Sequence, residues 1–171
     1  MQKKCFKPII NHATKVLVLG SMPGEKSLAE NQYYAFKHNK FWTIINELTG
    51  VDSTLDYTIR CKKLLGAGIG LWDVISTCTR AGSLDSAIKQ AEPNDFKTLI
   101  ENYSSLRAIC FNGQKSFSIF AKYFISKRSE LYLPELENIA LHKLPSTSPA
   151  HASISYDDKL TSWSVIKRYI I

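Results

Sequence analysis

The chain has 171 residues, of which 44% are hydrophobic, and a formal net charge of +7. This length fits a single domain over residues 1–171, and the hydrophobic fraction excludes a disordered chain. No apolar run approaches the ~20 residues that cross a bilayer, and the N-terminal segment lacks the apolar core of a signal peptide, so we expect a cytoplasmic protein. The positive charge favours a polyanionic partner, because lysine and arginine replace the counterions of phosphates.

The first part of the chain predicts one strand and two helices. Residues 15–19 form a short apolar, β-branched run that stops at Gly20, which is typical of a buried strand. From Asn39 onward, apolar residues fall on one helical face until Gly50 ends the pattern. A second helix is expected over residues 55–65.

The middle of the chain predicts two more strands with helices between them. The apolar run at 69–75 indicates a strand, and we expect a polar loop at 77–83 after it. Helices are expected around 84–90 and 94–103. The run at 106–111 then predicts a third strand, which Asn112 and Gly113 interrupt.

The last part of the chain completes an alternating pattern. Apolar residues at i, i+3, i+4 and i+7 predict a helix over 117–124. A fourth strand is expected at 139–144, a loop at 145–155, and a closing helix that carries Leu160 and Ile170.

Strands that alternate with helices predict an α/β fold, a three-layer α/β/α sandwich with a central four-stranded parallel sheet. In such sheets, binding sites form in loops at the carboxyl ends of the strands. The candidate site loops are therefore 20–39, 76–83, 112–115 and 145–155.

The four cysteines do not suggest a metal centre. They are scattered along the chain without a Cys-x-x-Cys pair, so neither a zinc site nor an iron–sulfur cluster is expected. We interpret them as reduced thiols and expect no metal and no cofactor.

Three segments in the candidate loops contain residues suited to nucleic acid. Gly20–Gly24 reads Gly-Ser-Met-Pro-Gly, which matches neither a dinucleotide fingerprint nor a phosphate loop, and by itself it is an ordinary turn. Residues 32–42 mix aromatics with bases, and aromatic faces stack on unpaired bases while lysines attract phosphate. Asn39 also lies where the cap of the following helix belongs. The small residues of 145–153 suit close approach to a DNA backbone, although a plain surface turn would look similar and a lone His151 is more often solvated.

In combination, these segments resemble the motifs of the uracil-DNA glycosylase superfamily. The resemblance rests on Gly20–Gly24, on Tyr34-Ala35 through Asn39-x-Phe41-Trp42, on Phe111-Asn112-Gly113 and on Ser148-Pro149, in this order. The Gly-Ser-Met-Pro-Gly and Ser-Thr-Ser-Pro-Ala versions look most like the deoxyinosine (hypoxanthine)-DNA glycosylase branch. Two departures from many members, Met22 for an acidic or amide residue and Ser148 for a histidine or asparagine, agree with that branch.

The resemblance implies roles for individual residues. It makes Asn39 the candidate catalytic residue. Tyr34 would stack on an extruded base, which the groups of Gly20, Ser21, Met22 and Asn112 would bind. The candidate DNA contacts are Lys37, Arg80, Lys115, Ser146, Ser148 and His151. Where relatives carry a bulky wedge this chain has Ala152, which leaves His151 and Ile154 as alternative plugs for the vacated base stack.

The function implied is that of a monofunctional, monomeric enzyme. It would flip a deaminated base, hypoxanthine or uracil, out of double- or single-stranded DNA and remove it by hydrolysis, since no lysine is placed as a Schiff-base nucleophile. Two alternatives stay open at this point. One is a module that binds damaged DNA without cutting it, and the other is a small-molecule or nucleotide hydrolase on the same scaffold.

Overall fold

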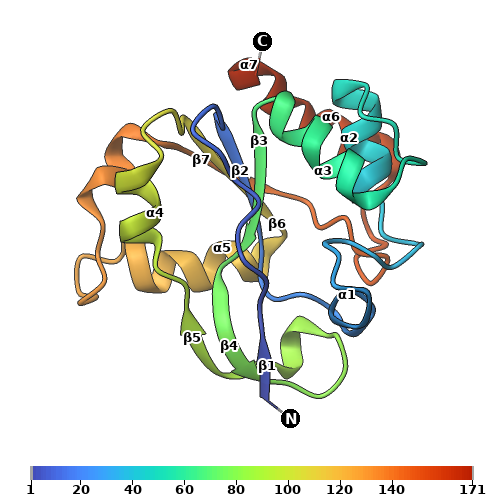
Figure 1. Ribbon diagram of the computed structural model, residues 1–171. Helices are drawn as coiled ribbons and strands as arrows, with labels where there is room; N and C mark the ends of the chain where they lie inside the picture. Colours follow the sequence, from blue (N-terminus) through green and yellow to red (C-terminus); the bar gives the residue numbers. More distant parts are fainter. Residues whose placement is uncertain (1, 171) are drawn as a thin grey trace.

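A computed structural model of the chain, which describes residues 2–170, has two sheets and helices on both faces of the larger one (Figure 1). The larger sheet is parallel and has the strand order β3-β2-β6-β7. Its strands are β2 (Val16–Gly20), β3 (Ile69–Asp73), β6 (Ala108–Asn112) and β7 (Ala140–Leu144). The predicted four-stranded parallel sheet is confirmed, with each strand within two residues of its expected position.

Helices cover the sheet because its strands are apolar on both faces. Val16 and Val18 face one buried cluster, and Leu17 and Leu19 face the other. In Figure 1, α4 and α5 lie on one side of the sheet, and α2, α3 and α6 lie on the other. The helices of the chain are α1 (Glu25–Glu30), α2 (Phe41–Thr49), α3 (Tyr57–Gly66), α4 (Phe96–Asn102), α5 (Gln114–Phe120), α6 (Tyr156–Trp163) and α7 (Lys167–Ile170).

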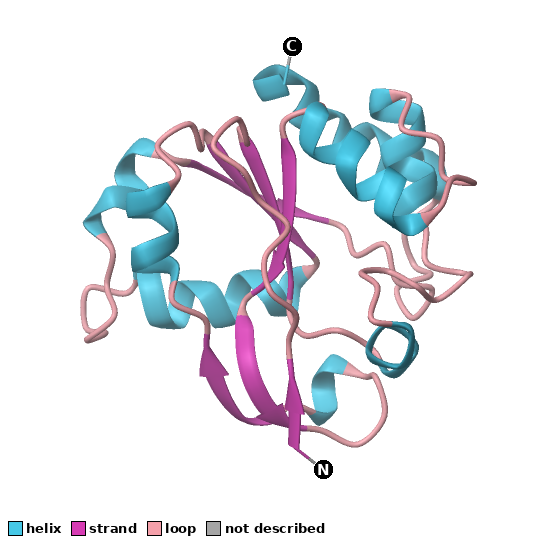
Figure 2. Cartoon of the chain, in the orientation of Figure 1, coloured by secondary structure: helices cyan, strands magenta, loops and turns pink. Residues whose placement is uncertain are grey.

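A second, antiparallel sheet was not predicted (Figure 2). It has the order β1-β4-β5 and consists of β1 (Gln2–Lys4), β4 (Ile75–Thr79) and β5 (Lys89–Pro93). The expected loop at 77–83 therefore begins only at residue 80, and the expected helix at 84–90 is wrong. Residues 85–87 form only a short 3-10 turn, because the backbone that follows pairs with β4 instead of with itself. The predicted helix at 94–103 is confirmed as α4.

The chain passes from one sheet to the other at Val74. The Val74 amide donates to the Gly20 carbonyl at 2.9 Å, and the Val74 carbonyl accepts from the Asn94 amide at 2.9 Å. The predicted strand at 69–75 is thus two strands, one in each sheet. This bend places the small sheet just beyond the carboxyl ends of β2 and β3 (Figure 1).

None of the helices in the described part of the chain is long and apolar enough to cross a membrane. Of the four cysteines, Cys78 and Cys110 are buried, Cys5 and Cys61 are half-buried, and all four are free thiols.

Gly70 tests how closely the N-terminal segment packs on the sheet. A Cβ atom at Gly70 would lie 2.8 Å from the Ile9 carbonyl oxygen. The backbone of Ile9 is held in place, because its amide donates to the Leu71 carbonyl and its carbonyl accepts from the Leu71 amide. We expect Gly70→Ala to lower the free energy of unfolding by about 1–3 kcal/mol, because this backbone contact cannot yield. Gly66→Ala is the control, since no atom lies within 4 Å of its Cβ position and alanine favours the helix. Urea denaturation of both variants measures the difference, and an equal response would contradict the packing argument.

Candidate active site

The carboxyl ends of all four parallel strands meet at one edge of the large sheet. Gly20 ends β2 and lies opposite Asp73, which ends β3; Asn112 ends β6 and lies opposite Leu144, which ends β7. In parallel α/β sheets this edge is the place where ligands bind. The predicted loops 20–39, 112–115 and 145–155 begin here, whereas 76–83 begins within β4 of the antiparallel sheet.

Asp73, Gly20 and Tyr34 form the centre of this edge. A Cβ atom at Gly20 would lie 2.6 Å from the Asp73 Oδ1 atom and 3.6 Å from the Tyr34 hydroxyl oxygen. A Cβ atom at position 20 would therefore clash with the carboxyl group, whereas its distance to the phenol is an ordinary contact. Asp73 is 3% exposed, and its Oδ2 atom is buried without a hydrogen bond to any residue of the described chain.

Burial favours the neutral form of the Asp73 carboxyl group. Desolvation is the main cause that raises its pKa to about 8, and the neighbouring Asp85 carboxylate raises it further while Arg80 opposes both effects. A protonated carboxyl group can donate a hydrogen bond as well as accept one. Burial likewise raises the pKa of Tyr34, so its side chain stays a neutral phenol.

A hydrogen bond holds Asp85 against the Gly20–Gly24 segment. Its Oδ1 atom accepts a 2.5 Å hydrogen bond from the Ser21 hydroxyl. Desolvation raises the pKa of Asp85, and the hydrogen bond from Ser21 opposes the shift. Two carboxyl groups thus lie around the Gly20–Met22 turn, one from β3 and one from the loop before β5.

Tyr34 is fixed by stacking and by its backbone. Its ring stacks on Phe41 with 3.9 Å between centroids and 23° between planes. Its φ of +57° is a left-handed conformation that is uncommon for a non-glycine residue. The preceding Tyr33 is anchored on both sides, because its amide donates to the Tyr57 hydroxyl at 2.9 Å and its carbonyl accepts from the Trp42 indole at 3.1 Å.

Asn112 is locked by a reciprocal pair of hydrogen bonds. Its Oδ1 atom accepts from the Thr147 amide at 2.9 Å, and its Nδ2 atom donates to the Thr147 hydroxyl at 2.9 Å. A backbone amide can only donate, so the pair fixes which way the Asn112 amide points.

Asn39 and Lys40 connect the motif of residues 34–42 with the loop 145–155, which carries the motif Ser148-Pro149. The Asn39 Oδ1 atom accepts from the Phe41 amide at 2.9 Å, which caps the first turn of α2 although Lys40 occupies the formal cap position. The Lys40 amide donates to the Thr147 carbonyl at 3.0 Å. Thr147 therefore joins the loop of Asn39 to the loop of Asn112 and Ser148.

Comparisons with known proteins identify this arrangement. The family model of the Uracil DNA glycosylase superfamily matches residues 8–168. This chain belongs to that superfamily. A Hypoxanthine DNA glycosylase of Methanosarcina acetivorans is 33% identical over 99% of this chain and 100% of its own length, and one of Methanosarcina barkeri is 38% identical over 68% of this chain and 74% of its own.

A solved structure agrees with the fold as well as with the sequence. The solution NMR structure of a Methanosarcina acetivorans protein, provisionally named a uracil DNA glycosylase, superposes with a TM-score of 0.81 at 33% identity. The superposition covers 98% of each chain. The fold class predicted for this superfamily member is therefore confirmed.

Among the predicted DNA contacts of this superfamily member, Arg80 is misassigned. Its side chain is 1% exposed, and its guanidinium donates to the Met22 and Pro23 carbonyls. A phosphate cannot reach a group buried in this way. Arg80 instead places a positive charge beside Asp73 and Asp85, where it offsets part of their burial.

The other predicted DNA contacts lie at or near the surface. Lys37, Lys115 and His151 are exposed, and Ser146 and Ser148 are half-buried in their loop. The side chain of Met22, which was predicted to bind the base, packs in a buried cluster with Ile75 and Cys78. Any contact between Met22 and a base therefore falls to its backbone amide.

Sequence patterns missed Asp73 and Asp85. Asp73 lies in the run 69–75, which predicted a strand from its apolar residues alone. The signal that could have identified Asp73 is that it is the one acidic residue in this apolar run. Asp85 gives no such signal, since only the folded chain brings it to Ser21.

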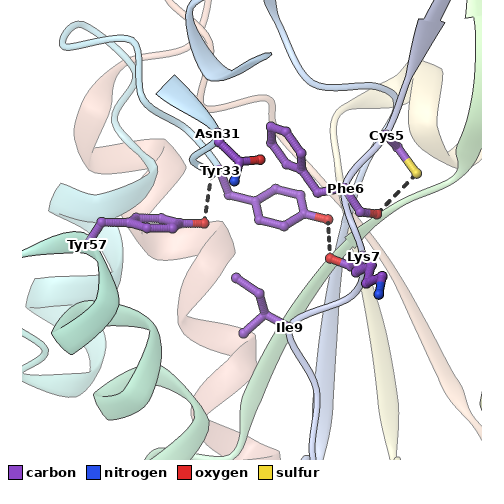
Figure 3. Close-up of a pocket in the computed structure, with 7 residues that line it drawn as sticks. All are labelled: Cys5, Phe6, Lys7, Ile9, Asn31, Tyr33 and Tyr57. Carbon is purple, nitrogen blue, oxygen red and sulfur yellow. Dashed lines mark hydrogen bonds between the residues drawn. The ribbon is translucent and has the colours of Figure 1, made fainter. Parts of the chain in front are cut away.

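A cavity of about 410 Å³ lies beside the site and holds none of the predicted residues (Figure 3). It lies between the N-terminal segment and Tyr33, whose hydroxyl donates to the Lys7 carbonyl at 3.4 Å. Its lining adds no charged group to the site apart from Lys7.

The protonated state of Asp73 predicts a pH effect on stability. Between about pH 4 and 8 the folded protein binds a proton at Asp73 that the unfolded chain has released, so stability falls as pH rises through this window. Asp73→Asn removes this contribution, which is at most about 1.4 kcal/mol per pH unit. Thermal unfolding from pH 5 to 8 should therefore show a smaller loss in the variant than in the natural protein. Asp157→Asn, which changes an exposed aspartate, is the control. If the stability of Asp73→Asn varied with pH in the same way as that of the natural protein, the assignment would be refuted.

Proposed function

We propose that this superfamily member removes hypoxanthine from DNA by hydrolysis of the N-glycosidic bond, as a monofunctional enzyme that extrudes the damaged nucleotide. The observation that carries the proposal is the meeting of Tyr34, Asp73 and Asn112 at the strand ends. Two relatives named Hypoxanthine DNA glycosylase support the choice of base. Uracil is the second candidate substrate, and action as a cytoplasmic monomer belongs to the same proposal.

Extrusion is required because the anomeric carbon is inaccessible inside a stacked duplex. Unstacking and unpairing cost a few kcal/mol, and a mispaired inosine costs less than a sound pair. Tyr34 would stack on the extruded base, with its ring held in place by Phe41. The ring is positioned before DNA arrives, which reduces the entropy lost on binding.

Base choice would depend on donors at the strand ends. Hypoxanthine presents a carbonyl oxygen at the position where adenine presents an amino group. The backbone amides of Ser21 and Met22 are the donors that this oxygen would meet. A fixed donor that faces an amino group stays unpaired, and an unpaired buried donor costs about 1–3 kcal/mol.

The same donors would assist bond cleavage. Negative charge develops on the departing base in the transition state, and preorganised donors stabilise it without reorganisation. Asn39 would orient the attacking water. Its oxygen caps α2, so its amide nitrogen is the group left to donate.

Excision itself is the first test. We expect the protein to produce alkali-labile abasic sites in a duplex that contains inosine, and a panel of inosine, uracil and xanthine duplexes ranks the substrates. Duplex binding without abasic sites would identify a non-catalytic binding module. Affinity should fall linearly in a plot of log K against log salt, whereas a salt-insensitive affinity would favour a small-molecule hydrolase.

Asn39 variants separate catalysis from helix capping. Asn39→Ser keeps an oxygen that can cap α2 but lacks the amide, so we expect excision to fall about a hundredfold or more while the melting temperature changes little. Asn39→Ala should lose excision to the same extent and also about 0.5–2 kcal/mol of stability. Single-turnover excision and thermal unfolding measure the two effects. Full activity in Asn39→Ser would show that Asn39 serves only as a cap.

A further inference from the structure

The loop between β4 and β5, residues 80–88, is fastened to the Gly20–Gly24 segment and to the start of α1. The Ser83 hydroxyl accepts from the Glu25 amide at 2.8 Å. The buried Arg80 guanidinium donates to two backbone carbonyls of the segment. The loop therefore keeps a fixed position relative to this segment, and so do the side chains that it carries.

Asp85 is the acidic residue of this loop, and half of its carboxyl group is free. Its Oδ1 atom accepts from the Ser21 hydroxyl at 2.5 Å. Its Oδ2 atom accepts no hydrogen bond within residues 2–170 and is not sealed inside the protein, so it is open to solvent. Asp73 is 3% exposed, whereas Asp85 is half-buried. Asp85 therefore lies at the rim of the candidate site, and Asp73 lies at its floor.

The charges around Asp85 favour a carboxylate at this rim. Burial raises the pKa of Asp85, but the hydrogen bond from Ser21 and the cations Arg80 and Lys115 all lower it. Asp73 has only Arg80 to oppose its burial, so the negative charge of the two acids lies on Asp85. Lys115 lies in the first turn of α5, just after the end of β6, so Asp85 is near the ends of both β2 and β6.

A negative charge at the mouth of a DNA site has a cost, because it repels phosphates and lowers affinity. Cleavage of a glycosidic bond nevertheless gives it a use, since positive charge develops on the sugar while negative charge develops on the base. The amides of Ser21 and Met22 would serve only the base, and the Met22 side chain is buried in an apolar cluster. With the base at the floor of the site, the sugar of the extruded nucleotide would lie at the rim, at the level of Asp85.

We propose that Asp85 is a further catalytic residue, whose free carboxylate oxygen contacts the deoxyribose of the extruded nucleotide and stabilises positive charge on the sugar. As the bond from the anomeric carbon to the base nitrogen breaks, both of its electrons leave with the base. The water that Asn39 orients then bonds to the anomeric carbon and gives a proton, through solvent, to the base. Asp85 forms no covalent bond in this sequence. The inference rests on the proposed function for the identity of the reaction.

Sugar analogues test this contact without cleavage. Affinity is measured for two duplexes that differ at one nucleotide, where one carries a cationic pyrrolidine ring in place of the deoxyribose and the other a neutral tetrahydrofuran ring. We expect the natural protein to prefer the cationic duplex by about tenfold or more, as for a charge-assisted hydrogen bond. Asp85→Asn keeps an oxygen that can accept from Ser21 but has no charge, so it should bind both duplexes equally. No preference in the natural protein, or an undiminished one in Asp85→Asn, would overturn the inference.

A matched control removes a negative charge at the opposite edge of the sheet. Glu101→Gln changes an exposed residue in the last turn of α4, which leads to the amino end of β6, and should keep the preference for the cationic duplex. Thermal unfolding shows whether each variant is folded. If Asp85→Asn does not fold, the neutral variant Asp85→Ser is tested in its place, with the same loss of preference expected.

Excision gives a second readout that a purely structural role would not produce. Asp85→Asn should remove hypoxanthine about a hundredfold or more slowly in a single turnover, as for loss of one preorganised electrostatic contact. It should bind the inosine duplex at least as tightly as the natural protein, because one repulsive charge is gone. A structural defect would instead lower affinity and rate together.

The two proposals can fail separately. A preference for the cationic sugar that depends on Asp85, without excision by the natural protein, refutes the proposed function alone. Excision that Asp85→Asn retains in full refutes the role of Asp85 alone.

Discussion

A carboxyl group buried at the end of β3, where burial favours its neutral form, constrains the residues around it. Asp73 ends β3 opposite the last residue of β2, and one of its oxygens has no partner in the described chain. Such a group is tolerated only if it is neutral or balanced by charge. Gly20 makes room for it, Tyr34 closes over it, and Arg80 is buried nearby as a balancing cation. Gly20 and Tyr34, which a bound base would contact in the proposed function, are thus also residues that allow this carboxyl group to be buried.

The other half of the site is organised by hydrogen bonds between loops. Thr147 accepts from the backbone of the Asn39 loop and exchanges two hydrogen bonds with Asn112. Thr147 therefore joins its own loop to two other segments that are far from it in the sequence. Stacking of Tyr34 on Phe41 adds an aromatic surface that is rigid before any ligand arrives. A site held in this way needs little rearrangement to stabilise charge on a departing base.

Met22 shows how this superfamily member departs from the pattern that its motifs resemble. The place where many members carry an acidic or amide side chain is occupied here by an apolar one, which packs with Ile75 and Cys78. A carboxyl group is nevertheless present at this edge, supplied by β3 through Asp73. This carboxyl group belongs to a different strand from the first motif, and burial raises its pKa to about 8.

The sequence by itself determined the four parallel strands, most of the helices and the loops that carry the motifs. Apolar runs that end in Gly20 or Asn112, and apolar residues at helical spacing, are local signals that tertiary contacts reinforce. The tertiary structure alone decided the antiparallel sheet, because β4 and β5 are half-polar and become strands only by pairing with each other. It also decided that Arg80 is buried and that Asp85 reaches Ser21. The partner of a buried charge depends on distances in space, which hydrophobic periodicity along the chain does not encode.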